Sequence, residues 1–321
     1  MPGLPKGAPC LSGAPIPPKK ESDMTDQATS RTDDAAVSSS DSNNELSNET
    51  NNDSQLVSAL ARGIRILQCY SMGASELSAR ELVERTGLPK PTALRLINTL
   101  CEFGMLRYSE RISKYVLGTE MLSLTAPALG RMTIRQIARP MMQELADYCQ
   151  GQVTLAVGYR LNLAYAEVAQ GAGSAVYRSE IGTRLSLSRT ASGRAYLWTV
   201  PGAERERYLQ ETLTRDPAKG ELLAQRLTQA QQELREQGCT VSHGDMQREI
   251  HSVAIPLASP IDDEYWVFSC SIAVFNISGN QLTDDIAPRL MSLVRRVEAA
   301  LGSMTGAAHD METRPWSVSA N

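Results

Sequence analysis

Side chains that can form hydrogen bonds recur at helical spacing in the first third of the chain. They are Lys90, Thr92, Arg95 and Asn98, and they fall outside the apolar stripe of the same segment. Arg95 presents its donors as a fork, the geometry that pairs with the two acceptors on the major-groove edge of guanine. With Pro91 in the first turn, where its missing N–H costs nothing, these residues predict a helix that contacts the edges of DNA bases.

Two short helices and a tight turn must position these side chains. Leu82 and Val83 follow Ala79 by three and four residues, which is the spacing of a single buried stripe on a helix. Gly87 permits a sharp helix end, and Pro89 cannot continue the helix cheaply. The pattern favours a helix-turn-helix of the DNA-reading type; a plain helical hairpin with solvated polar residues is the alternative.

The flanking segments favour the DNA-reading interpretation. Residues 56–67 have apolar side chains at helical spacing, and residues 105–108 and 115–117 predict two short strands. Three helices followed by a hairpin make a winged helix-turn-helix. We expect the cations of this wing to contact phosphates, which position the domain without reading sequence. They are Arg107, Arg111 and Lys114.

Charge is distributed unevenly along the chain. The whole chain has a net charge of −4, yet residues 55–117 carry nine basic and five acidic side chains. The basic ones are Arg62, Arg65, Arg80, Arg85, Lys90, Arg95, Arg107, Arg111 and Lys114, and the acidic ones are Glu76, Glu81, Glu84, Glu102 and Glu110. A local basic excess in an acidic chain is what contact with a phosphate backbone requires.

These residues resemble the IclR-type bacterial transcriptional regulators. Residues 59–67 look like the family's first-helix signature, residues 86–97 like its turn and recognition helix, and residues 115–118 like the end of its wing. Residues 181–195 are in register with a segment of the family's effector domain. The resemblance covers about residues 55–303.

The chain departs from the family's pattern at four positions. It has Ser186, Ser188 and Arg194 where the family usually has proline, histidine and lysine. Pro91 stands where the family often has serine. These differences concern the recognition of effector and operator and leave the fold unaffected.

The resemblance implies an α+β architecture in three parts. A winged helix-turn-helix at 55–118, with its motif at 79–98, is followed by a linker helix at 119–132 and a GAF-like α/β-sheet effector-binding domain at 133–303. It further implies a ligand-responsive transcription regulator that binds double-stranded operator DNA. We expect a homodimer or a dimer of dimers, because two-fold operators match two-fold proteins.

Hydrophobic patterning beyond the linker also predicts a sheet domain with helices. The expected helices span residues 133–149, 192–200, 203–212, 222–237 and 284–301. The expected strands span residues 153–159, 163–168, 176–181, 240–242, 250–257 and 267–275. A domain of this composition can enclose a small ligand.

The resemblance also places the effector pocket. By register it would be lined by Ser188, Ile250, Ser252, Ala273 and Phe275. Where relatives often present hydroxyl or thiol groups, the alanine and phenylalanine favour a partly apolar ligand, an organic or aromatic acid. A further residue, Arg184, has the geometry to pair an effector carboxylate, and a structural salt bridge is the alternative.

The two ends of the chain differ in composition from the rest. Residues 1–54 are first rich in proline and glycine and then acidic and rich in serine and asparagine, which predicts a disordered tail. Residues 304–321 are expected to form a flexible tail, and translation from Met24 is an alternative to Met1. The pattern indicates neither a signal peptide nor a membrane span, so we expect no membrane partner and a cytoplasmic protein.

The composition also bears on enzymatic function. Six scattered cysteines and three histidines give no metal-ligand spacing, so we expect no metal and no cofactor. A nucleophile with its base, a paired-carboxylate site and a phosphate-binding glycine loop are not found, so we expect no catalytic residues and no enzyme. The alternative is a metabolite-binding protein or enzyme in which the helix-turn-helix is only a packing module.

Overall fold

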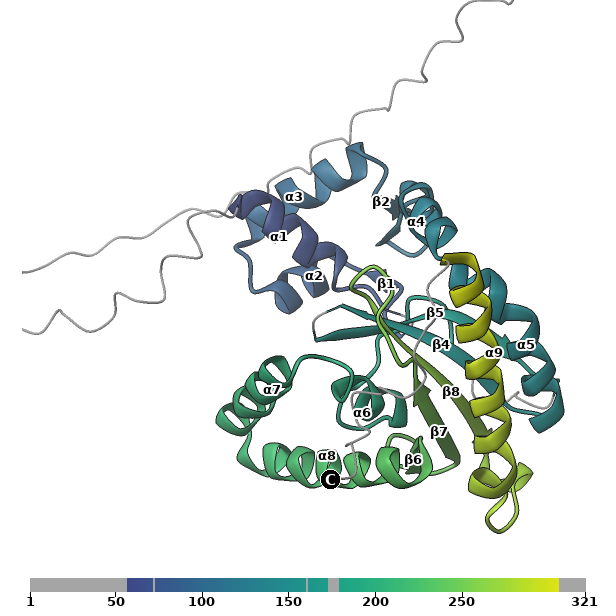
Figure 1. The fold of residues 1–321 in the computed structure, drawn as a ribbon. Coiled ribbons are helices and arrows are strands. Elements are labelled where there is room, and N and C mark those ends of the chain that lie inside the picture. Colours follow the sequence, from purple (N-terminus) through teal and green to yellow (C-terminus); the bar gives the residue numbers. More distant parts are fainter. Residues whose placement is uncertain (1–56, 72, 160, 173–178, 306–321) are drawn as a thin grey trace, which may run out of the picture. The chain divides into compact units, whose positions relative to one another are not determined.

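The computed structural model describes residues 57–71, 73–159, 161–172 and 179–305 (Figure 1). The tail expected at 1–54 lies outside these residues. So do most of the expected tail at 304–321 and the first half of the strand expected at 176–181; residues 179–181 of that strand are described and are not in a strand.

The N-terminal part that the structure describes is a winged helix-turn-helix. Its helices are α1 (Ser58–Leu67), α2 (Ala79–Thr86) and α3 (Lys90–Glu102). Its strands are β1 (Glu76–Leu77), β2 (Leu106–Ser109) and β3 (Lys114–Leu117). The strands form an antiparallel sheet in the order β1-β3-β2, so the expected two-stranded wing gains a short third strand.

Local side-chain chemistry explains the helix ends in this domain. The hydroxyl of Ser78 accepts a hydrogen bond from the N–H of Glu81, whose carboxylate accepts one in return from the N–H of Ser78, a capping box that starts α2. Gly87 ends α2 with a φ of 65°, a conformation that glycine adopts without strain. The three helices then close over a small core that includes the buried side chains of Ile66 and Ile97.

A single helix follows the wing. Helix α4 (Glu120–Arg131) is apolar in sequence, yet none of its residues is buried. The side chains of Leu122 and Leu124 are 72% and 55% exposed. The expected linker helix is therefore present, and it offers an apolar surface.

The C-terminal part is built on one five-stranded antiparallel sheet. Its strands are β4 (Gln152–Tyr159), β5 (Asn162–Gln170), β6 (Thr240–His243), β7 (Ile250–Pro256) and β8 (Tyr265–Ala273). The strand order is β5-β4-β8-β7-β6. Its helices are α5 (Thr133–Cys149), α6 (Ala191–Leu197), α7 (Gly202–Arg215), α8 (Pro217–Gln237) and α9 (Ala287–Thr305), the last entered through a π-helical turn at Leu282–Ile286.

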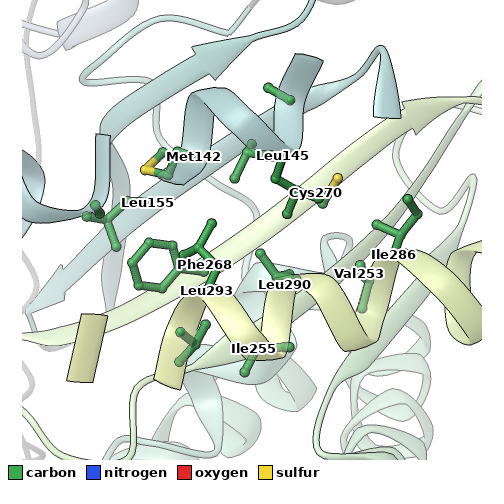
Figure 2. Packing of buried hydrophobic residues seen from close by; sticks show 14 of the residues in the cluster. Met142, Leu145, Leu155, Val253, Ile255, Phe268, Cys270, Ile286, Leu290 and Leu293 are labelled. Carbon is green, nitrogen blue, oxygen red and sulfur yellow. The ribbon is translucent and has the colours of Figure 1, made fainter. Parts of the chain in front are cut away.

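Helices cover both faces of this sheet, because the strands are apolar on both sides. Helices α5 and α9 pack together on one face, and Figure 2 shows Met142 and Leu293 meeting Phe268 in that core. The opposite face is covered by α6, with Ala195 and Tyr196 buried in a second core. The α6 face is the one that contains the polar cavity described below.

One expected strand is too long. Strand β8 ends at Ala273, and Phe275 lies in a 3-10 helix at Val274–Asn276, where its side chain is 69% exposed. The neighbouring strand β7 starts only at Ile250, the partner of Ala273, so the ladder has no further strand residues to pair with. The expectation that the strand at 267–275 extends to Phe275 was wrong.

Candidate nucleic-acid interface and effector pocket

The exposed side of α3 carries most of the residues expected to read bases. Lys90, Pro91, Arg95 and Asn98 are exposed. Thr92 is half-buried, because it faces the groove between α3 and α1. The structure thus brings Arg95 and Asn98 onto one solvent-facing surface, as an interface with a DNA groove requires.

The wing presents its cations unequally. Arg107 and Arg111 are exposed. The ammonium group of Lys114 lies 3.6 Å from a carboxylate oxygen of Glu81 and donates to the carbonyl oxygen of Glu76 at 3.4 Å. Lys114 therefore holds the wing to the start of α2, and the two arginines are the freer phosphate donors.

A groove of about 630 Å³ lies between α1 and α3. Its walls are mainly apolar, with Leu60 and Ile64 from α1 facing Leu96 and Leu100 from α3, while Thr92 and Arg95 line the α3 side of the same groove. The apolar spacing of α1 predicted a helix packed behind the motif, and α1 also has this second, exposed apolar side. A surface of this kind on a small domain is typical of a protein interface.

The C-terminal domain contains a cavity of about 40 Å³ between the sheet and α6. Its lining is rich in hydroxyl groups. The lining residues are Tyr165, Arg189, Thr190, Ser192, Ser242, Met246, Gln247, Ile250, Ser252 and Ser271. Polar side chains that converge on a cavity between a sheet and a helix are typical of a small-molecule site.

The floor of this cavity is a row of serines on adjacent strands. Ser242 on β6 is paired with Ser252 on β7, which is paired with Ser271 on β8. Residues paired directly across antiparallel strands have their side chains on the same face of the sheet. The sheet register therefore places three hydroxyls side by side under one cavity.

A loop between β6 and β7 closes one side of the cavity and is held by ion pairs. Asp245 accepts a hydrogen bond from Arg194 Nη1 at 2.9 Å, pairs with Arg226, and accepts a bond from the hydroxyl of Ser242 at 3.0 Å. Arg189 donates to the carbonyl oxygen of Met246 at 3.3 Å. The loop residues Met246 and Gln247 are thereby held against the cavity.

Burial makes this network costly to break. The side chain of Arg194 is 2% exposed, and its burial lowers the pKa of the guanidinium, although Asp245 opposes that change. Partial burial raises the pKa of Asp245, but Arg226, Arg194 and Ser242 outweigh it and hold the pKa below its ordinary value. Both groups are therefore charged at neutral pH.

The structure brings two of the six expected effector residues into the cavity wall, Ile250 and Ser252. The others lie elsewhere. Arg184 is exposed beside Ala164 at the sheet edge, and Ser188 offers its carbonyl oxygen to Arg194. Ala273 is on the same face as Ser271, two residues beyond it and outside the lining, and Phe275 is on the exposed 3-10 helix.

Sequence reasoning missed seven polar lining residues, which are Tyr165, Arg189, Thr190, Ser192, Ser242, Gln247 and Ser271. Arg189 and Ser192 are close in sequence to Ser188, and Ser271 is two positions before Ala273, so the errors are small shifts along the chain. Gln247 belongs to a loop without periodic pattern. Ser269 and Ser271, two residues apart on one strand, were the sequence signal that could have indicated a polar face at this cavity.

Two other kinds of feature are absent from the part of the chain that the structure describes. There, no group of three or more histidine, cysteine or acidic side chains is arranged to hold a metal ion. Across the same residues, no helix has the length and apolarity needed to cross a bilayer.

Comparison with known proteins agrees with both halves of this description. Residues 59–110 match the IclR helix-turn-helix domain, and residues 126–298 match the family described as bacterial transcriptional regulator IclR C-terminal. The HTH-type transcriptional regulator TsaQ1/TsaQ2 of Comamonas testosteroni is 30% identical over 248 residues, which are 77% of this chain and 89% of that protein.

Solved structures show the same fold. An IclR family transcriptional regulator from Brucella abortus aligns with a TM-score of 0.69 and 35% identity, over 80% of this chain and 97% of that one. An IclR homolog from Microbacterium hydrocarbonoxydans, crystallised with 4-hydroxybenzoate, aligns with a TM-score of 0.59 over 76% of this chain and 99% of that one. At 21% identity, the second likeness concerns the fold alone.

Proposed function

This chain belongs to the IclR family of bacterial transcriptional regulators, and from that premise we propose that it binds operator DNA as a dimer and responds to a small organic acid. It is a transcription regulator with a helix-turn-helix DNA-binding domain and a C-terminal effector-binding domain. The finer parts of the proposal are the residues that contact DNA, the dimer and the class of effector.

The observation that carries the DNA-binding proposal is the exposed surface of α3. Arg95 and Asn98 are both solvent-facing, and Arg107 and Arg111 add exposed cations on the wing. Arginine and asparagine are the side chains that pair bidentately with guanine and adenine in the major groove. In this arrangement α3 reads bases and the wing contacts phosphates.

Two apolar surfaces on the same chain support a dimer. One is the groove between α1 and α3, and the other is α4, whose residues are all outside the core. If α4 of each copy enters the groove of the other, both surfaces are buried by one two-fold contact. Such a dimer also supplies the two recognition helices that a palindromic operator requires.

The dimer can be tested with Ile64→Glu in the groove and Leu124→Glu on α4. Both should dissociate the dimer in sedimentation velocity, because each places a carboxylate in an apolar contact. Leu222→Glu on α8 is the control, since Leu222 is similarly exposed but belongs to neither surface. A dimer that survives both changes would have a different interface.

The effector proposal rests on the hydroxyl-lined cavity. Its volume of about 40 Å³ accommodates on the order of three water-sized groups, which suits a carboxylate and its neighbouring carbon. Arg189 lies on the lining and offers a cation for such a group. The relative crystallised with 4-hydroxybenzoate is consistent with an acid, and an aromatic ring is larger than this cavity of about 40 Å³.

The experiment begins with selection of genomic fragments by the full chain, which supplies the operator. Operator binding is then measured with and without a panel of short organic acids. Ser252→Leu should fill the cavity and abolish the response while operator binding without acid persists, because a ligand shifts DNA binding only by its differential affinity for two states. Ser303→Leu, an exposed serine on α9, is the control. A normal response from Ser252→Leu would place the effector elsewhere.

A further inference from the structure

We propose that Gln152 and Ser179 form a second polar subsite of the effector cavity, which recognises a distal hydroxyl or carbonyl oxygen of the acid. This inference rests on the proposed effector function and names the ligand class more closely. The ligand would be a short-chain carboxylic acid with an uncharged oxygen at its far end.

The sheet register places Gln152 next to the cavity. Gln152 on β4 is paired directly with Ser271 on β8, so the row of Ser242, Ser252 and Ser271 continues onto a fourth strand. Neighbouring strands are about 4.8 Å apart. The amide of Gln152 therefore extends the polar floor by one strand spacing beyond the serine at the cavity edge.

The amide of Gln152 has a fixed orientation. The backbone N–H of Ser179 donates to Gln152 Oε1 at 3.2 Å. A flipped amide would set two donors against each other, so the oxygen must face Ser179 and the NH₂ group must face elsewhere. On the side away from the Ser179 backbone, Gln152 thus presents N–H donors and no acceptor.

Those donors are buried and unpaired. The side chains of Gln152 and Ser179 are 1% and 5% exposed, and neither Gln152 Nε2 nor the Ser179 hydroxyl has a hydrogen-bond partner among the described residues. Native proteins rarely leave buried polar groups unpaired, and the exceptions often mark functional sites. Two such neighbouring groups, one strand beyond Ser271 on the cavity wall, point to an oxygen acceptor supplied from outside.

The next row of the same sheet face shows the contrast. Thr154 and Ser269 share a hydrogen bond of 2.7 Å, and Thr240 donates to the carbonyl oxygen of Ala191 at 2.9 Å. The hydroxyl groups of that row form their hydrogen bonds within the protein. The hydroxyl groups in this neighbouring row are therefore paired. The unpaired donors on this face lie at the end of the serine row, at Gln152 and Ser179.

The charges near the row define the class of ligand. Among the described lining residues of the cavity, Arg189 is the cation, and the described contacts of Gln152 and Ser179 include no charged group. A second carboxylate at Gln152 would be buried without a counter-ion, which is unfavourable. A hydroxyl or carbonyl oxygen suits the neutral donors, so the carboxylate belongs at the Arg189 end.

The spacing of about 4.8 Å between Ser271 on the cavity wall and Gln152 is comparable with the length of a four-carbon acid. The probes are butanoate, 4-hydroxybutanoate and butanedioate, which share a chain length and differ only at the distal group. Binding to the full chain is measured by isothermal titration calorimetry. The wild type should bind 4-hydroxybutanoate on the order of tenfold more tightly than butanoate, with butanedioate no better than butanoate.

The matched variant is Gln152→Met, which keeps the side-chain length and removes the N–H donors. It should bind butanoate as the wild type does and lose most of the preference for 4-hydroxybutanoate. Ser179→Ala should lose part of that preference, and it keeps the test decisive if Gln152→Met does not fold. Gln229→Met on α8 is the control, because Gln229 is exposed and bonded to Glu233.

The outcomes separate this inference from the proposed function. Equal wild-type binding of butanoate and 4-hydroxybutanoate overturns the subsite, as does a preference that survives both Gln152→Met and Ser179→Ala. If Ser252→Leu abolishes binding of the acids while the preference is insensitive to Gln152, only the subsite fails. If Ser252→Leu leaves binding of the acids intact, the cavity itself is not the effector site.

Discussion

Arg194 Nη1 lies 2.9 Å from Asp245 Oδ2, and this contact ties α6 to the loop that closes the effector cavity. Arg226 on α8 binds the same carboxylate, and Arg194 also donates to the carbonyl oxygen of Val241 at 2.6 Å. The network thus connects three segments of the chain around one aspartate. The network holds the loop between β6 and β7, because the two cations belong to helices α6 and α8 and the carboxylate belongs to the loop.

The first prediction concerns the stability that Asp245 provides. Asp245→Asn should lower the free energy of unfolding by about 3–5 kcal/mol, because it leaves the buried Arg194 charge without its partner. Urea denaturation followed by circular dichroism measures the change. Asp262→Asn is the control, since the exposed Asp262 pairs with Arg131 only at 3.9 Å and should change stability by less than about 1 kcal/mol. Equal effects of the two changes would contradict the prediction.

The second prediction is the pH dependence of the same residue. The pKa of Asp245 is held below its ordinary value of 3.8, so its contribution is complete above that value and is lost as pH falls through the folded-state pKa. The stability difference between wild type and Asp245→Asn should be constant from about pH 7 to 5 and should shrink below pH 4. Denaturation curves across this range measure it. A difference that shrinks on raising the pH would have the wrong sign.

The third prediction concerns base reading. Arg95→Ala should weaken operator binding by about 1–3 kcal/mol and relax the sequence preference, because the forked donors of an exposed arginine are lost. Binding-site selection with the variant shows whether the motif changes. Arg296→Ala in the effector domain is the control. An unchanged motif would remove Arg95 from the base contacts.

The fourth prediction separates the cations of the wing. Arg111→Ala should weaken specific and nonspecific DNA about equally and reduce the log–log salt slope by about one. Lys114→Ala should change the slope less, because its ammonium group already contacts Glu81 and the carbonyl oxygen of Glu76. Affinities measured at several salt concentrations give both slopes. A larger effect at Lys114 would show that these internal contacts give way to phosphate.

The sequence predicted the helices of the DNA-binding domain well, because their ends have chemical causes. Gly87 ends α2 and Pro91 lies in the first turn of α3, and both helices begin and end within a few residues of the expected positions. Helix α5 has the expected bounds, Thr133–Cys149. Strand β1 was missed, since two residues are too few for a periodic pattern.

The effector pocket was harder to predict, because its wall is assembled from distant segments. Ser252 and Ser271 share a floor only through the register of β7 with β8, which periodicity does not fix. Ser188 and its neighbour Arg189 lie in a turn without periodic pattern, where Ser188 offers its carbonyl oxygen to Arg194 and Arg189 lines the cavity. Asp245 belongs to a loop, where local sequence gave no signal for its two arginine partners.

The exposed helix α4 has a consequence for how the protein folds. Isolated helices shorter than about 12–15 residues are marginal in water, and α4 has 12 residues with Pro127 inside it. Its helical order must therefore come from whatever surface covers it. If that surface belongs to another copy of the chain, the linker helix between the DNA-binding and effector-binding domains becomes ordered only when two copies associate. The stiffness of this linker then depends on protein concentration.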